Sequence, residues 1–163
     1  MLRGPSDSAL AQACVDIGAA PGAWTQYLAC TSERVVAIDP ACLSAACLAL
    51  PNVVHLKQQS QLCVDDTLRA LELPGASGQA LSLDLIVCDM NMPTAVTCAA
   101  IAPLLAALRP GGRVVMTCKM RGDGRKKDFA HVFSRFETLE DMQVLWLLAN
   151  TPYERTFAGR KRL

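Results

Sequence analysis

Three charged residues, Asp89, Lys119 and Glu154, stand at the ends of apolar runs and could together perform proton transfer or charge stabilisation. Asp89 follows the run 83–88, Lys119 follows the run 113–118, and Glu154 comes immediately before a further stretch rich in strand-forming residues. A lysine between two carboxylates can take up a proton when neutral or stabilise an oxyanion when charged. Burial would lower the pKa of such a lysine and the carboxylates would raise it, so both roles stay open.

A second group of residues has the spacing of a nucleoside-binding turn. The segment Gly18-Ala19-Ala20-Pro21-Gly22 ends an apolar run and leads into an amphipathic segment, Trp24 to Leu28. A turn bracketed by glycines lets backbone N–H groups at the start of a helix approach a ligand closely. The next apolar run ends in Asp39, at the position where such folds hydrogen-bond ribose hydroxyls. The two signals predict a nucleoside-cofactor domain.

The elements that must position these residues alternate along the chain. Strands are expected at 14–18, 34–39, 53–57, 83–89, 112–119, 142–149 and 154–160, and helices at 22–31, 41–49, 61–72, 94–108 and 125–137. This alternation predicts right-handed crossovers and a mostly parallel, doubly wound sheet. The last two strands are joined only by residues 150–153, too few for a crossover, so they should form an antiparallel hairpin.

This topology places the three charged residues together. In a doubly wound sheet the ligand lies at the carboxyl ends of the parallel strands, where Asp89 and Lys119 are expected. An antiparallel final strand begins at the same edge, with Glu154 as its first residue. Simpler explanations exist for each residue taken alone: a lysine stem packed on apolar surface, a helix N-cap at Asp89, and a solvated charge at Glu154. Their expected convergence favours the functional interpretation.

The composition describes one domain with a large interior. The 163 residues are 52% hydrophobic and 19% charged, which suits a sheet covered by helices on both faces. The eight cysteines include no CxxC pair, so we expect reduced thiols and no metal site, in a reducing intracellular compartment with the cytoplasm favoured over an organelle. Without an apolar run of about 18 residues, no membrane span is expected.

Together these segments resemble the FtsJ-like (RrmJ-type) ribose 2′-O-methyltransferases, and within that group the methyltransferase M type that acts on large-subunit ribosomal RNA. The matching segments are Asp16–Thr25, Val87–Met90, Gly111–Gly112 with Lys119, and Tyr153–Arg155, and the likeness spans about residues 14–160. It implies an α/β, Rossmann-like class I methyltransferase fold, with a seven-stranded, mostly parallel sheet and an antiparallel last strand. The cofactor implied is S-adenosylmethionine. Residues 1–163 would form a single methyltransferase domain that lacks most of the usual N-terminal extension.

The resemblance also implies a role for individual residues. Asp89, Lys119 and Glu154 match the last three members of a Lys-Asp-Lys-Glu catalytic tetrad, whereas the first lysine has no match, since Arg3 is the only basic residue before the first strand. Where the family usually has an acidic residue that contacts adenine, this chain has a glutamine, which can hydrogen-bond without charge. The cofactor-binding positions carried over are Gly18, Ala20, Pro21, Gly22, Ala23, Trp24, Asp39, Gln59 and Asp89.

The partner implied is RNA, with ribosomal RNA favoured. Basic residues expected to contact it across the site edge are Arg121, Arg125, Lys126, Lys127 and, in the basic tail, Arg160. A ribonucleoprotein or protein partner could supply the missing N-terminal region. One alternative is a catalytically silent domain that acts as a ribonucleoprotein assembly or structural component. A nicotinamide-dependent oxidoreductase is disfavoured because the turn is not GxGxxG. A small-molecule methyltransferase would need additional chain to build a lid or substrate pocket.

Overall fold

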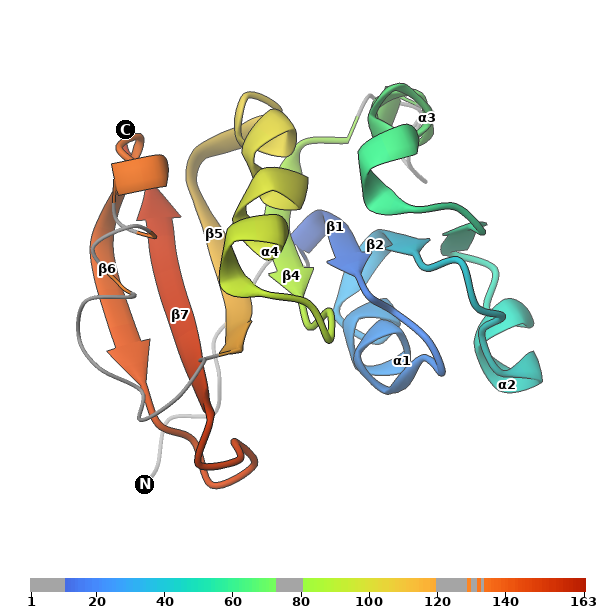
Figure 1. Cartoon of the computed structure of the whole chain (residues 1–163). Helices are drawn as coiled ribbons and strands as arrows, with labels where there is room; N and C mark the ends of the chain where they lie inside the picture. Colours follow the sequence, from blue (N-terminus) through green and yellow to red (C-terminus); the bar gives the residue numbers. More distant parts are fainter. Residues whose placement is uncertain (1–10, 73–80, 120–128, 130–131, 133) are drawn as a thin grey trace, which may run out of the picture.

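The computed structural model describes residues 11–72, 81–119, 129, 132 and 134–163. Among these residues, strands form one seven-stranded sheet in the order β3-β2-β1-β4-β5-β7-β6 (Figure 1). The strands β1 to β5 pair in parallel, and β7 pairs antiparallel with both β5 and β6. Their bounds are β1 Ala11–Ile17, β2 Ser32–Ile38, β3 Val53–Leu56, β4 Leu83–Cys88, β5 Leu108–Lys119, β6 Leu139–Leu145 and β7 Glu154–Lys161. The α/β sheet with an antiparallel last strand is therefore confirmed.

Helices cover both faces of this sheet. They are α1 Ala23–Ala29, α2 Ala45–Leu48, α3 Val64–Glu72 and α4 Thr94–Ile101, with short 3-10 helices η1 Ser60–Leu62 and η2 Ala102–Leu105. Successive strand residues point to opposite faces. Cys14 accordingly packs in one cluster with Leu28 of α1, and Val15 packs in the main core with Ile101 of α4. No helix in the described part of the chain is long and apolar enough to cross a bilayer.

The helix expected at 41–49 is only Ala45–Leu48, and the helix expected at 125–137 lies largely outside the described residues. Two further boundaries differ from the sequence expectation at the middle of the chain. Helix α4 ends at Ile101 and continues only as η2, which has Pro103 in its first turn, because proline lacks an N–H and cannot extend an α-helix. Strand β5 begins at Leu108 instead of residue 112. Its pairing with β4 jumps from Leu108 to Arg113, so the expected turn at 110–112 lies within an irregularity of the strand.

The sixth strand is also displaced from its expected range of 142–149. It begins at Leu139, whose side chain is fully buried in the main core, and it ends at Leu145. The apolar residues that follow, among them Trp146 at 65% exposure, lie outside the sheet. Apolar character alone suggested a strand there, but the segment 146–153 instead forms the connection to β7.

Candidate active site

The charged side chains of Asp89, Lys119 and Glu154 meet at one edge of the sheet. Lys119 is the last residue of β5 and pairs in register with Glu154, the first residue of β7. The Lys119 Nζ lies 2.5 Å from Glu154 Oε1 and 3.4 Å from Asp89 Oδ1. Helix α4 has Pro93 as its N-cap, so Asp89 does not cap it. The expected convergence of the three residues is confirmed.

The electrostatics of this cluster favour the charged form of the lysine. Partial burial lowers the pKa of Lys119, but the hydrogen bond to Glu154 and the charges of Asp89 and Glu154 outweigh it, so the net pKa is raised. The same bond from Lys119, with the N–H of Thr151 that donates to Glu154 Oε2 at 3.0 Å, lowers the pKa of Glu154. At neutral pH the cluster therefore holds an ammonium between carboxylates.

The turn after β1 needs glycine at both of its ends. Gly18 has φ 79° and Gly22 has φ 116°, in the left-handed region that favours glycine. A Cβ at Gly18 would lie 2.9 Å from the backbone nitrogen of Met90, and a Cβ at Gly22 would lie 2.2 Å from the Cys47 Sγ. The turn is thus held tightly between the end of β4 and helix α2.

Asp39, directly after β2, fixes the same turn through its carboxylate. One oxygen accepts a hydrogen bond from the backbone N–H of Ala20 at 3.1 Å, and the other accepts from the N–H of Ala41 at 2.8 Å. An ionised carboxylate offers about four lone-pair sites, so Asp39 can still accept bonds from ligand hydroxyls.

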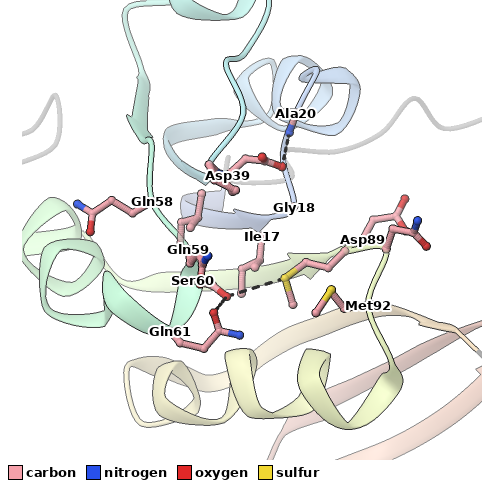
Figure 2. A pocket seen from close by; sticks show the side chains of 14 residues that line it. Ile17, Gly18, Ala20, Asp39, Gln58, Gln59, Ser60, Gln61, Asp89 and Met92 are labelled. Atoms are coloured by element: carbon pink, nitrogen blue, oxygen red, sulfur yellow. Dashed lines mark hydrogen bonds between the residues drawn. The ribbon is translucent and has the colours of Figure 1, made fainter.

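A cavity of about 490 Å³ opens over the ends of β1, β2 and β4 (Figure 2). This volume falls within the range typical of small-molecule sites. Its walls combine apolar side chains with amides and carboxylates, and η1 closes one side. The lining residues are Ile17, Gly18, Ala20, Ile38, Asp39, Pro40, Gln58, Gln59, Ser60, Gln61, Asp89, Met90, Asn91 and Met92.

The predicted cofactor residues divide into two groups around this cavity. Gly18, Ala20, Asp39, Gln59 and Asp89 line it. The turn residues Pro21, Gly22, Ala23 and Trp24 are not among its lining residues, and the Trp24 side chain at the start of α1 is 44% exposed. Lys119 and Glu154 lie outside the cavity, and Asp89 connects them to it.

Comparisons with known proteins identify the family of this chain. A sequence profile of the FtsJ-like methyltransferases matches residues 5–140. The chain belongs to the FtsJ-like methyltransferase family. The uncharacterized protein MJ1257 of Methanocaldococcus jannaschii is 26% identical over 151 residues, which cover 90% of this chain and 40% of that relative. This FtsJ-like methyltransferase therefore spans less than half the length of that curated relative.

Solved structures share the fold of this FtsJ-like methyltransferase. SMU.1697c from Streptococcus mutans, in complex with SAH, matches with a TM-score of 0.64 and 15% identity over 92% of this chain and 88% of the other. An rRNA methylase from Streptococcus thermophilus matches with a TM-score of 0.63 and 16% identity over 94% and 89%. SAH is the demethylated product of S-adenosylmethionine, and the cofactor expected from the sequence agrees with it. In the described part of the chain no His, Cys, Asp and Glu side chains gather as a metal site.

The structure places Arg160, a predicted RNA contact, away from the edge of the sheet that holds the site. Strand β7 runs away from the edge that holds Glu154, so Arg160 lies about 20 Å further along it, at a rise near 3.4 Å per residue. Its guanidinium is paired there with Glu140 at 2.9 Å and Asp141 at 3.2 Å. Sequence proximity to the C-terminus did not reveal which end of the strand each basic residue occupies. The other predicted RNA contacts, Arg121, Arg125, Lys126 and Lys127, and the basic Arg3 lie outside the described residues.

Sequence reasoning missed two features of the site. Met90, Asn91 and Met92 line the cavity, and their position directly after Asp89 was the signal that could have found them. Asp16 is 1% exposed beneath the turn, and its carboxylate accepts a 2.7 Å hydrogen bond from the Thr25 hydroxyl. Desolvation raises the pKa of Asp16 to about 6, against the hydrogen bond from Thr25, which lowers it.

Proposed function

We propose that this FtsJ-like methyltransferase transfers a methyl group from S-adenosylmethionine to a ribose 2′-hydroxyl of RNA, with ribosomal RNA the favoured substrate. One observation carries the proposal: Asp89 lines the cavity and also lies 3.4 Å from the ammonium of Lys119. A reacting group at this wall of the cavity is within reach of a paired cation. The rRNA methylase of similar fold supports RNA as the substrate class.

The residues present fit S-adenosylmethionine, whose sulfonium supplies an electrophilic methyl group when bound. Ile38, Met90 and Met92 offer apolar surface for the adenine ring, and Gln59 offers an amide for its polar edge. Asp39 retains acceptor capacity for the ribose hydroxyls beside the backbone bonds it already accepts. In our proposal the carboxylate of Asp89 lies beside the methyl group.

In the proposed step, the ribose oxygen forms a bond to the methyl carbon as the carbon–sulfur bond breaks and its electron pair passes to sulfur. The raised pKa of Lys119 makes it a cation, so it stabilises negative charge on the attacking oxygen instead of removing its proton. Glu154, whose pKa is lowered, holds the ammonium in place. The proton of the hydroxyl is released to water.

The test compares methyl transfer by the wild type and a Lys119→Met variant, with labelled S-adenosylmethionine and unmethylated ribosomal RNA as substrates. Loss of the oxyanion-stabilising cation should lower kcat by about 10²- to 10³-fold. The affinity for S-adenosylmethionine, measured by isothermal titration calorimetry, should stay nearly unchanged because Lys119 does not line the cavity. Mass spectrometry of nuclease digests should locate the methyl group on a ribose.

Lys161→Met is the matched control, because this lysine lies at the opposite end of β7 and bonds only to backbone carbonyls in the described part of the chain. It should retain methyl transfer. Full activity of Lys119→Met, or a label found on a base, would refute the proposed chemistry. Absence of S-adenosylmethionine binding by the wild type would instead support the catalytically silent domain.

A further inference from the structure

The connection between β6 and β7 lies where β7 begins, at the edge of the sheet that holds the candidate active site (Figure 1). In this segment, 146–153, Trp146 is 65% exposed, Tyr153 is 61% exposed and Leu148 is fully exposed. Large side chains exposed together near a site typically mark a binding surface. These three side chains follow the end of β6 at Leu145, so they make no contribution to the pairing of that strand.

One of these rings carries a guanidinium on its face. The Arg155 guanidinium carbon lies 4.3 Å from the centroid of the Trp146 ring, the geometry of a cation–π contact. The same guanidinium donates hydrogen bonds to the carbonyls of Pro152 at 3.1 Å and Glu154 at 2.6 Å, so it is fixed. Trp146 is 65% exposed even though one face of its ring lies against Arg155, so it keeps surface that a planar ligand can reach.

The segment is braced and joined to the catalytic cluster. The Asn150 side-chain oxygen accepts from the N–H of Leu147 at 2.9 Å and from the Thr156 hydroxyl at 3.2 Å. The N–H of Thr151 donates to Glu154, the carboxylate that holds Lys119. A ligand on Trp146 would therefore lie at the same end of β7 as the reacting groups.

We propose that Trp146, backed by Arg155, is a stacking platform for an unpaired base of the RNA substrate, a role that rests on the proposed function. Aromatic rings and guanidinium planes are the groups on which single-stranded bases stack, and the positive charge of Arg155 also favours a polyanion. Glu154 and Arg155 are neighbours on β7 and so point to opposite faces of the sheet. An RNA strand that passes around this edge, from one face to the other, would bring one ribose to Lys119 and a base further along the strand to Trp146.

The experiment measures the affinity of the full chain for a labelled ten-nucleotide single-stranded RNA and for the same RNA with abasic positions, by fluorescence anisotropy without cofactor. Stacking of one base predicts that the wild type binds the base-bearing RNA about tenfold more tightly. Trp146→Ala should remove this preference and leave the abasic affinity nearly unchanged, and Trp146→Phe should keep most of it. Leu148→Ala is the matched control and should behave as the wild type.

Each other result would overturn the platform. No base preference in the wild type, or a preference that survives Trp146→Ala, would show that Trp146 does not stack on a base. If Leu148→Ala and Trp146→Ala each weakened binding of the base-bearing and the abasic RNA to the same extent, Trp146 would make only a general apolar contact. Such a surface would suit a protein partner instead of a stacked base. The proposed function fails by a different result. Base-dependent binding without methyl transfer would refute the reaction and leave the stacking platform standing. Methyl transfer without a base preference would refute the platform and leave the reaction standing.

Discussion

Asp16 should make the stability of this protein decrease as the pH rises from acidic to neutral. Its carboxyl is buried beneath the turn at residues 18–22, and desolvation raises its pKa from the ordinary value of 3.8 to about 6. The Thr25 hydrogen bond opposes this rise, and the charges of Asp89 and Asp39 add to it. The folded state thus retains a proton that the unfolded state releases. Below pH 3.8, the ordinary pKa, Asp16 does not destabilise the folded state. The free energy of unfolding then falls as the pH rises from there through the folded-state pKa of about 6.

The size of the effect follows from the two pKa values. Their separation corresponds to a loss of about 3 kcal/mol in the free energy of unfolding once the pH is well above 6. Between about pH 4.5 and pH 7.5 the loss from this one group is about 2 kcal/mol, because part of it has already occurred at the lower pH. Asp16→Asn removes the titration, and its side-chain carbonyl can still accept from the Thr25 hydroxyl.

Urea denaturation of the wild type and Asp16→Asn at both pH values tests this reasoning. Titration of the other groups, including the lowered pKa of Glu154, is common to both proteins and cancels in the difference between them. The wild type should lose about 2 kcal/mol relative to Asp16→Asn on going from the lower to the higher pH. A constant difference between the two proteins would show that Asp16 is ionised at both pH values in the folded state, and the desolvation argument would be wrong.

Substitutions at Gly22 and at Lys161 test other parts of the structure. Gly22→Ala should destabilise the fold by at least about 1–2 kcal/mol and weaken S-adenosylmethionine binding in calorimetry, since φ is 116° and its Cβ would lie 2.2 Å from the Cys47 Sγ. Cys47→Ala in the same background should recover only the part due to the contact; full recovery would contradict the backbone argument. Lys161→Met should lower the free energy of unfolding by about 1–3 kcal/mol, because its ammonium bonds to the carbonyls of residues 105, 106 and 108. Equal urea midpoints for this variant and the wild type would contradict that role.

Much of the site could be predicted because it depends on backbone topology. The alternation of strands and helices places the ends of β4 and β5 at one edge, and a connection too short for a crossover brings Glu154 back to it. The glycine turn at Gly18 and the carboxylate of Asp39 follow from local patterns of the same kind. The sequence pattern misjudged the ends of β6 because apolar residues at 146–148 satisfy the rule for a strand, whereas burial of Leu139 decides where the strand begins.

The sequence by itself determined the fold class, the glycine turn after β1 and the three charged residues that meet at one edge of the sheet. Only the tertiary structure decided the charge of Lys119, the pairing of Arg160 away from the site, and the cavity wall contributed by η1. The physical reason is one of scale. Local patterns fix the path of the backbone. The pKa of Lys119, in contrast, depends on its burial and on its Nζ lying 2.5 Å from Glu154 Oε1 and 3.4 Å from Asp89 Oδ1, and strand register and packing set those distances.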